Sequence, residues 1–124
     1  AKKCLDDAFV FDTQQGDYVS IGKDFDIIIA SELVEHLFMP EHFLRNIQKA
    51  MLSETKLIIT TPNFLVWTNR LRMLAGQFEY TKSGFLDESH IHFFTYNSLK
   101  KIMEQTEIIP PFDLVLSDMA PRTT

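Results

Sequence analysis

The stretch FDIIIASELVEHL, residues 25–37, decides the fold because its character changes halfway along. Its first part contains the consecutive isoleucines of residues 27–29, and a β-branched run of this kind favours a strand buried on both faces, as in the middle of a parallel sheet. From Ser31 onward the residues have the pattern of a helical turn. We therefore expect a strand over residues 25–30 that leads directly into a helical turn.

Outward from this stretch, the chain alternates between segments typical of strands and segments typical of helices. Short apolar runs predict further strands at residues 8–11, 56–61 and 112–116. Apolar periodicity predicts helices at residues 40–51, at residues 63–75 and after the capping residue Thr95. Trp67 is expected in the core. The alternation predicts an α/β fold with a parallel or mixed sheet covered by helices.

The composition is that of one globular domain. The chain has 124 residues, 45% of them hydrophobic and 23% charged, which is enough for one core and too little for two domains. No window approaches the roughly 18 apolar residues that a membrane span requires, so we expect no membrane partner. The net charge of −5 argues against a nucleic-acid partner. The single Cys4 excludes an internal disulfide and suits a cytoplasmic location.

Polar residues gather where the predicted strands end, which is where ligands bind in parallel sheets. Glu32, Glu35 and His36 have the spacing i, i+3, i+4, which predicts that they share one face of a helical turn. Two carboxylates and an imidazole suit a divalent cation, and either His90 or His92 could complete the set from a later segment. The alternative is that these side chains are solvated near a helix N-terminus, where the helix dipole favours glutamate.

Two further features of the sequence suggest a bound small molecule. Asp12 ends the predicted strand at residues 8–11, a position where contact with a ligand is common. Phe78, Tyr80 and Phe85 lie along an irregular segment, and aromatic residues on such a loop could cover a small-molecule substrate.

Three separated segments resemble the class I S-adenosylmethionine-dependent methyltransferases, in the order that this family has them. Residues 25–37 look like its fourth-strand motif, and TTPN at residues 60–63 looks like the end of its fifth strand. Residues 76–102 are similar to the region that follows in a branch that often modifies sugars or small hydroxylated molecules. The resemblance implies a Rossmann-like three-layer sandwich and O-methylation of such a substrate, with S-adenosylmethionine as the cofactor.

The resemblance also implies roles for single residues. Asp12 would contact the adenine of the cofactor, while Ala30, Ser31 and Glu32 would line its methionine part. The catalytic residues would be His36 and Glu32, with His36 as the general base if no metal is used.

The E-x-x-E-H pattern further resembles two metal-using branches of the family. These are the ubiquinone-pathway O-methyltransferases and the small-RNA terminal 2′-O-methyltransferases. Their ligands would fall on Glu32, Glu35, His36 and His90, with Mg²⁺ or another divalent cation bound there. Such a cation would lower the pKa of a substrate hydroxyl.

The sequence departs from the family pattern in its first half. The chain has four scattered glycines, so the glycine-rich loop GxGxxG is absent, as is the acid that ends the second strand. We therefore expect residues 1–124 to form a single partial domain, truncated at its N-terminus, that self-associates through an exposed sheet edge. Two alternatives remain: a non-catalytic remnant that acts as an interaction module, and a metal-dependent RNA 2′-O-methyltransferase.

The end of the chain allows two interpretations. Residues 111–124 either contain the sixth strand of the same sheet or are a foreign segment. The second interpretation rests on FDLVLSDMAP, residues 112–121, which resembles the fourth-strand segment of ribosomal-RNA 2′-O-methyltransferases.

Overall fold

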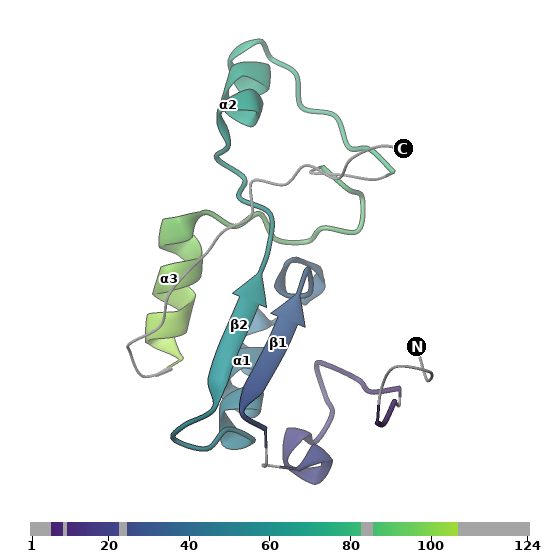
Figure 1. The fold of residues 1–124 in the computed structure, drawn as a ribbon. Coiled ribbons are helices and arrows are strands. Elements are labelled where there is room, and N and C mark those ends of the chain that lie inside the picture. The colour runs from purple at the N-terminus through teal and green to yellow at the C-terminus, as the bar shows by residue number, and fades with distance from the viewer. Residues whose placement is uncertain (1–5, 9, 23–24, 83–85, 107–124) are drawn as a thin grey trace.

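The computed structural model describes residues 6–8, 10–22, 25–82 and 86–106. Its elements follow the chain in this order: η1 Tyr18–Ile21, β1 Ile27–Ser31, η2 Val34–His36, α1 Pro40–Lys49, β2 Lys56–Thr60, α2 Trp67–Leu74 and α3 Tyr96–Gln105. Here η denotes a short 3₁₀ helix, while α and β denote α-helices and strands (Figure 1).

The two strands β1 and β2 form a parallel pair. Their register runs from Ile27 opposite Lys56 to Ser31 opposite Thr60, and α1 crosses between them (Figure 1). This confirms the strands predicted around the isoleucine run and at residues 56–61, and it confirms their parallel pairing. The carboxyl ends of both strands therefore meet at one edge of the sheet, where the predicted site residues follow.

The core lies between the sheet and the helices. Residues on one face of each strand, such as Ala30 and Ile59, are buried with the apolar stripe of α1 and with Leu99 and Met103 of α3. Figure 1 shows α1 behind the strands and the opposite face of the sheet uncovered by any labelled helix. The arrangement agrees with the predicted α/β class, although the described residues do not form a three-layer sandwich.

Helix α1 forms where the sequence predicted it. Pro40 occupies the first turn, where its missing N–H costs no hydrogen bond. Phe43, Leu44 and Ile47 then lie buried along one side, and the helix ends at Lys49 with Ala50 as its C-cap. This stripe is what holds α1 against the sheet.

The predicted strand at residues 8–11 is wrong where the structure describes it. Ala8, Val10 and Phe11 are irregular, and Phe11 packs edge-on against Tyr18 at 4.8 Å between ring centroids. Among the described residues the sheet consists of β1 and β2 alone, so this segment has no strand to pair with, and the Oδ1 of Asp12 accepts hydrogen bonds from the amides of Gln14 and Gln15 in the turn that follows. Residues 111–124 lie outside the described residues.

Helix α2 also differs from the prediction, because it begins at Trp67 and not at Asn63. Asn63 forms a turn, with its side chain accepting from Leu65 N, and it bridges to Phe94. Trp67 is exposed, so its predicted place in the core is wrong. The residue of α2 that is buried is Asn69. Within the described part of the chain, no helix is long and apolar enough to cross a membrane.

Candidate functional site

The candidate site begins where the two strands end. Glu32 follows β1 with a backbone φ of +48°, in the left-handed region that non-glycine residues rarely adopt. Glu32 N donates a hydrogen bond to Thr60 O at 3.0 Å, and Ser31 Oγ lies 2.9 Å from Thr60 Oγ1. These bonds tie the ends of β1 and β2 together and direct the chain into η2.

Glu35 is the buried acid of the site. Only 1% of its surface is exposed, and the fully buried Thr61 donates from Oγ1 to Glu35 Oε2 at 3.0 Å. No hydrogen-bond partner for Glu35 Oε1 is present among the described residues. Burial raises the pKa of Glu35 above its usual range, and the bond from Thr61 opposes part of that rise. A buried carboxylate oxygen in this condition calls for a proton, a water molecule or a cation.

Two imidazoles form a compact cluster with Glu35. Each of Glu35, His36 and His90 offers one ligand atom, and these three atoms lie within 4.8 Å of one another. His36 Nδ1 is 3.0 Å from the carbonyl oxygen of Ser89. Because a carbonyl can only accept, Nδ1 carries the proton and the neutral ring has its lone pair on Nε2. A backbone carbonyl in this position is the usual way to orient a metal-binding histidine.

The loop that carries His90 is fastened to η2 through the backbone of Glu35. The carbonyl oxygen of Glu35 accepts from Ile91 N at 2.9 Å and from His92 N at 3.0 Å. Asp87 shapes the start of this loop, because it accepts from the hydroxyl and the amide of Ser89. Those two bonds lower the pKa of Asp87. The backbone on both sides of His90 is thus fixed by hydrogen bonds.

Glu32 is not a member of the cluster that Glu35, His36 and His90 form. The prediction that Glu32, Glu35 and His36 share one face of a helical turn is wrong. The short helix η2 contains only Val34–His36, and Glu32 precedes it in a left-handed conformation. Its side chain is exposed, and its charge contributes a small part of the raised pKa of Glu35. The structure therefore brings together three of the four predicted ligand residues.

A cavity of about 320 Å³ lies beside β1, between η1 and α1. Its lining is mostly apolar, and its volume is near the lower limit of ligand pockets. The residues that line it are Thr13, Tyr18, Ile21, Phe25, Ile27, Ile28, Ile29, Ala30, Leu33, Phe43, Ile47 and Ala50. Asp12 is the neighbour of Thr13 in the chain, and hydrogen bonds from Gln15 and Gln14 lower its pKa. Ala30 lines this cavity, whereas the hydroxyl of Ser31 is bound to Thr60.

Four aromatic rings gather beyond the carboxyl ends of the strands. Phe93 is 5.0 Å from Phe64, 6.5 Å from Phe78 and 6.3 Å from Tyr80, measured between ring centroids. Phe78 and Tyr80 are exposed, while Phe64 and Phe93 are partly buried. We call these four residues the aromatic cluster. Phe85, which the sequence grouped with Phe78 and Tyr80, lies outside the described residues.

Comparison with known families identifies the domain. A family model described as a methyltransferase domain matches residues 5–107. The chain belongs to the class I S-adenosylmethionine-dependent methyltransferases. No curated protein matches it. S-adenosylmethionine is the cofactor that this family uses in general.

Sequence reasoning about this methyltransferase expected a polar site residue at Thr61 but missed its bond to Glu35, and it missed half of the aromatic cluster. Thr61 directly follows β2, and its place after an apolar strand is the signal that predicts a site residue there. Phe64 and Phe93 carried no such signal, because their contact joins segments that are distant in the chain. Phe64 N donates to Phe94 O at 2.7 Å, which sets this contact.

Proposed function

We propose that this methyltransferase transfers the methyl group of S-adenosylmethionine to a hydroxyl oxygen of a small hydroxylated or sugar-like substrate. We also propose that Glu35, His36 and His90 hold a divalent cation beside that hydroxyl. The observation that carries the second part is the buried carboxylate of Glu35, which lies in a cluster with two imidazoles and whose Oε1 has no hydrogen-bond partner in the described structure.

The donor set of the cluster fits a divalent cation. Two imidazole nitrogens and one carboxylate oxygen suit Mn²⁺ or Zn²⁺ better than Mg²⁺, which prefers oxygen ligands. Thr61 holds one carboxylate oxygen of Glu35, and Ser89 O leaves Nε2 of His36 free to bind. A bound cation would stabilise the negative charge that develops on a substrate hydroxyl. Glu32 is proposed as a further donor from the sequence pattern alone.

The protein itself can also assist proton removal. With Nδ1–H of His36 bound to Ser89 O, the lone pair on Nε2 can accept a proton from a hydroxyl. In a protein without bound metal, His36 is therefore the proposed general base. Glu32, exposed at the end of β1, is the second proposed catalytic residue.

The cavity beside β1 is the proposed place for the adenine end of the cofactor. Its apolar walls suit a planar ring, and Thr13 places the turn of Asp12 next to it. Ala30, Ser31 and Glu32, at the end of β1, are proposed to line the methionine end. The exposed rings of Phe78 and Tyr80 are proposed to cover the substrate.

Titration calorimetry with Mn²⁺ and Mg²⁺ tests the cation site. We expect one site with a preference for Mn²⁺, and we expect Glu35→Gln to weaken binding at least about tenfold, as loss of a ligand does. Glu54→Gln is the matched control, because Glu54 is an exposed glutamate outside the cluster. Equal affinity of the wild type and Glu35→Gln would show that the cluster is not the metal site.

A separate titration with S-adenosylmethionine tests the transfer proposal. We expect binding that Asp12→Ala weakens, while Glu35→Gln leaves cofactor affinity unchanged. An absence of binding at millimolar cofactor would remove the enzymatic function for this chain and leave the cation result standing.

A further inference from the structure

A β-turn over residues 87–90 carries His90, one of the three residues of the proposed cation site. The amide of His90 donates to the carbonyl oxygen of Asp87 at 3.0 Å, which closes the turn. Aspartate is a favoured first residue of such a turn, because its side chain can bond the backbone two residues further on. Asp87 makes this bond: its Oδ1 accepts from Ser89 N at 2.8 Å and also from Ser89 Oγ.

One peptide group links this turn to His36. It is the group between Ser89 and His90, whose N–H is held by Asp87 O and whose carbonyl oxygen lies 3.0 Å from His36 Nδ1. Because a peptide group is planar, a fixed direction of its N–H also fixes the direction of its carbonyl. The orientation of the His36 ring therefore depends on the turn that Asp87 closes.

We propose that Asp87 is a positioning residue for the cluster: it fixes the carbonyl oxygen of Ser89, and through that oxygen it keeps the proton of His36 on Nδ1. The inference rests on the proposed function in its consequence, because Nε2 of His36 needs a lone pair to bind a cation or to accept a proton. Asp87 is not one of the three residues whose ligand atoms lie within 4.8 Å of one another. We therefore assign its effect to the bonds with Ser89.

The charge of Asp87 is the competing explanation. The bonds from Ser89 are the main cause of the lowered pKa of Asp87, and the charges of His90 and His36 lower it further. The carboxylate is thus close enough to both rings to attract a cation through space. Asparagine keeps an acceptor oxygen at the same position and removes the charge, so Asp87→Asn separates the two explanations.

NMR of the imidazole nitrogens in the metal-free protein measures the tautomer directly. In mildly alkaline buffer the rings are neutral. We expect His36 to carry its proton on Nδ1 in the wild type and in Asp87→Asn, and we expect Asp87→Ala to lose most of that preference. His42 is the internal control, because its Nδ1 lies 3.0 Å from the carbonyl oxygen of Gln14, in a different part of the chain. Its tautomer should be the same in every variant.

Calorimetric titration with Mn²⁺ measures the consequence at the cluster. We expect Asp87→Ala to weaken binding at least about tenfold, as loss of an outer partner of a ligand does, and Asp87→Asn to stay within about threefold of the wild type.

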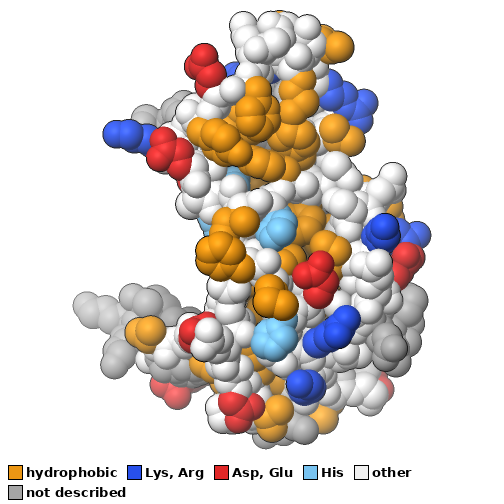
Figure 2. Space-filling view, turned by 180° about the vertical axis from the view of Figure 1, so that it is seen from behind, with side chains coloured by type: hydrophobic (Ala, Val, Ile, Leu, Met, Phe, Trp, Pro, Cys, Tyr) orange, Lys and Arg blue, Asp and Glu red, His pale blue; other side chains and the backbone are white. Residues whose placement is uncertain are grey.

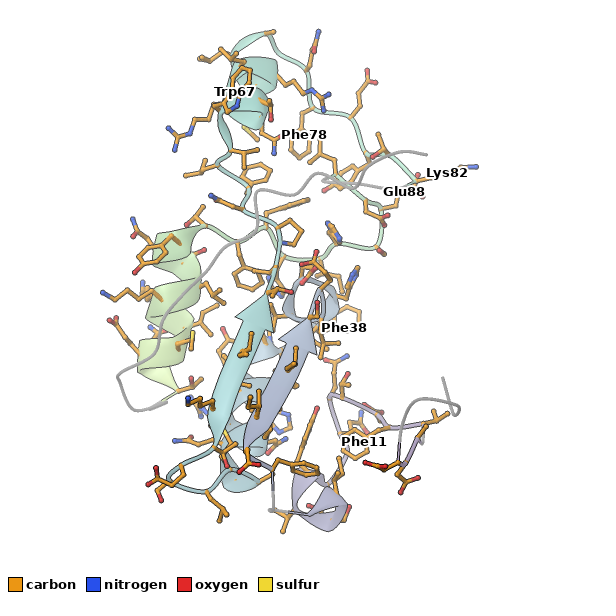
Figure 3. The ribbon with its side chains drawn as sticks, in the orientation of Figure 1. Phe11, Phe38, Trp67, Phe78, Lys82 and Glu88 are labelled. Carbon is orange, nitrogen blue, oxygen red and sulfur yellow. The ribbon has the colours of Figure 1, made fainter. Side chains whose placement is uncertain are left out.

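Glu88→Ala is the matched control, because it removes the same charge from the neighbouring position. Glu88 is exposed, and Figure 3 shows it on the loop beyond the carboxyl ends of the strands. In the view from behind, acidic and basic side chains project from this edge of the molecule (Figure 2). The variant should therefore keep the turn, the tautomer of His36 and the affinity for Mn²⁺.

Two results would overturn the proposal. The first is an unchanged tautomer of His36 in Asp87→Ala. The second is an Asp87→Asn variant that matches Asp87→Ala in both measurements, which would assign the effect to charge. Ser89→Ala, which removes only the hydroxyl bond, should shift the tautomer in the same direction by a smaller amount and serves in place of Asp87→Ala if that variant does not fold. A wild type that binds no Mn²⁺ would remove the cation proposal, while the tautomer would still decide the role of Asp87.

Discussion

Glu35 combines three contacts that follow from its burial. One carboxylate oxygen accepts from Thr61, a carboxylate oxygen lies in the cluster with two imidazoles, and the backbone carbonyl holds the loop of His90. The E-x-x-E-H pattern predicted Glu35 and His36 at the site, because residue type and spacing are local properties. The pattern could not distinguish the exposed Glu32 from the buried Glu35. Their positions depend on the left-handed backbone of Glu32 and on the bond between Glu35 and Thr61, which lies 26 residues further along the chain.

Tyr18 makes the stability of the protein depend on pH at the alkaline end. Burial, with a smaller contribution from Asp12, raises its pKa from 10.0 to about 12. The unfolded chain loses the phenolic proton near pH 10, while the folded chain keeps it to about pH 12. Unfolding is therefore favoured as pH rises across this interval, and we expect the free energy of unfolding to fall by about 2 kcal/mol.

Urea unfolding of the wild type and Tyr18→Phe between these two pH values measures this contribution. The variant should lose the dependence, although it also loses the hydrogen bond from the Tyr18 hydroxyl to Thr13 O. Parallel curves for the two proteins would contradict the assignment, because Tyr18 would then contribute nothing to the pH dependence.

At the scale of elements, the sequence predicts the end of a helix correctly where a nearby side chain caps that end. Thr95 was expected to cap a helix, and it does: Thr95 and Ser98 form a reciprocal capping box at the start of α3. The start of α2 was misplaced because Asn63 forms a turn and a bridge to Phe94, a contact that no local pattern contains. Periodicity alone also predicted that Trp67 lies in the core, whereas it is exposed, because periodicity cannot tell which side of a helix meets the core.

The capping box predicts the cost of its removal. Thr95→Ala should lower the free energy of unfolding by about 1 kcal/mol, because the amide of Ser98 loses its acceptor. Thr68→Ala, an exposed threonine inside α2, is the control and should cause no loss. A smaller effect at Thr95 than at Thr68 in chemical denaturation would be inconsistent with a stabilising cap.

At the scale of the whole molecule, the sheet is open. Among the described residues β1 pairs only with β2, and Ile27, Ile29 and Ile58 are exposed on the face that α1 does not cover. Parallel sheets are normally covered on both faces. The missing family motifs predict an exposed sheet edge, and this stays a prediction, while the number of layers could not be read from a pattern of alternating elements.

The open sheet predicts self-association of the chain. Ile29→Lys should shift the protein toward monomer in sedimentation velocity, because a lysine on an edge strand opposes pairing with another chain. Leu52→Lys, which also places a lysine at an exposed aliphatic position, should leave the distribution unchanged. A wild-type protein that is monomeric at all concentrations would refute this expectation.

The contact between His36 and Ser89 spans 53 residues of chain, and this length has a kinetic meaning. Closing so long a loop costs entropy that is recovered only when the intervening strand and helices have packed. We therefore expect the three ligand atoms to come together late in folding, and a local opening that frees Ile91 and His92 from Glu35 would separate them again. Protection of those two amides against hydrogen exchange and affinity at the cluster are consequently two measures of one equilibrium.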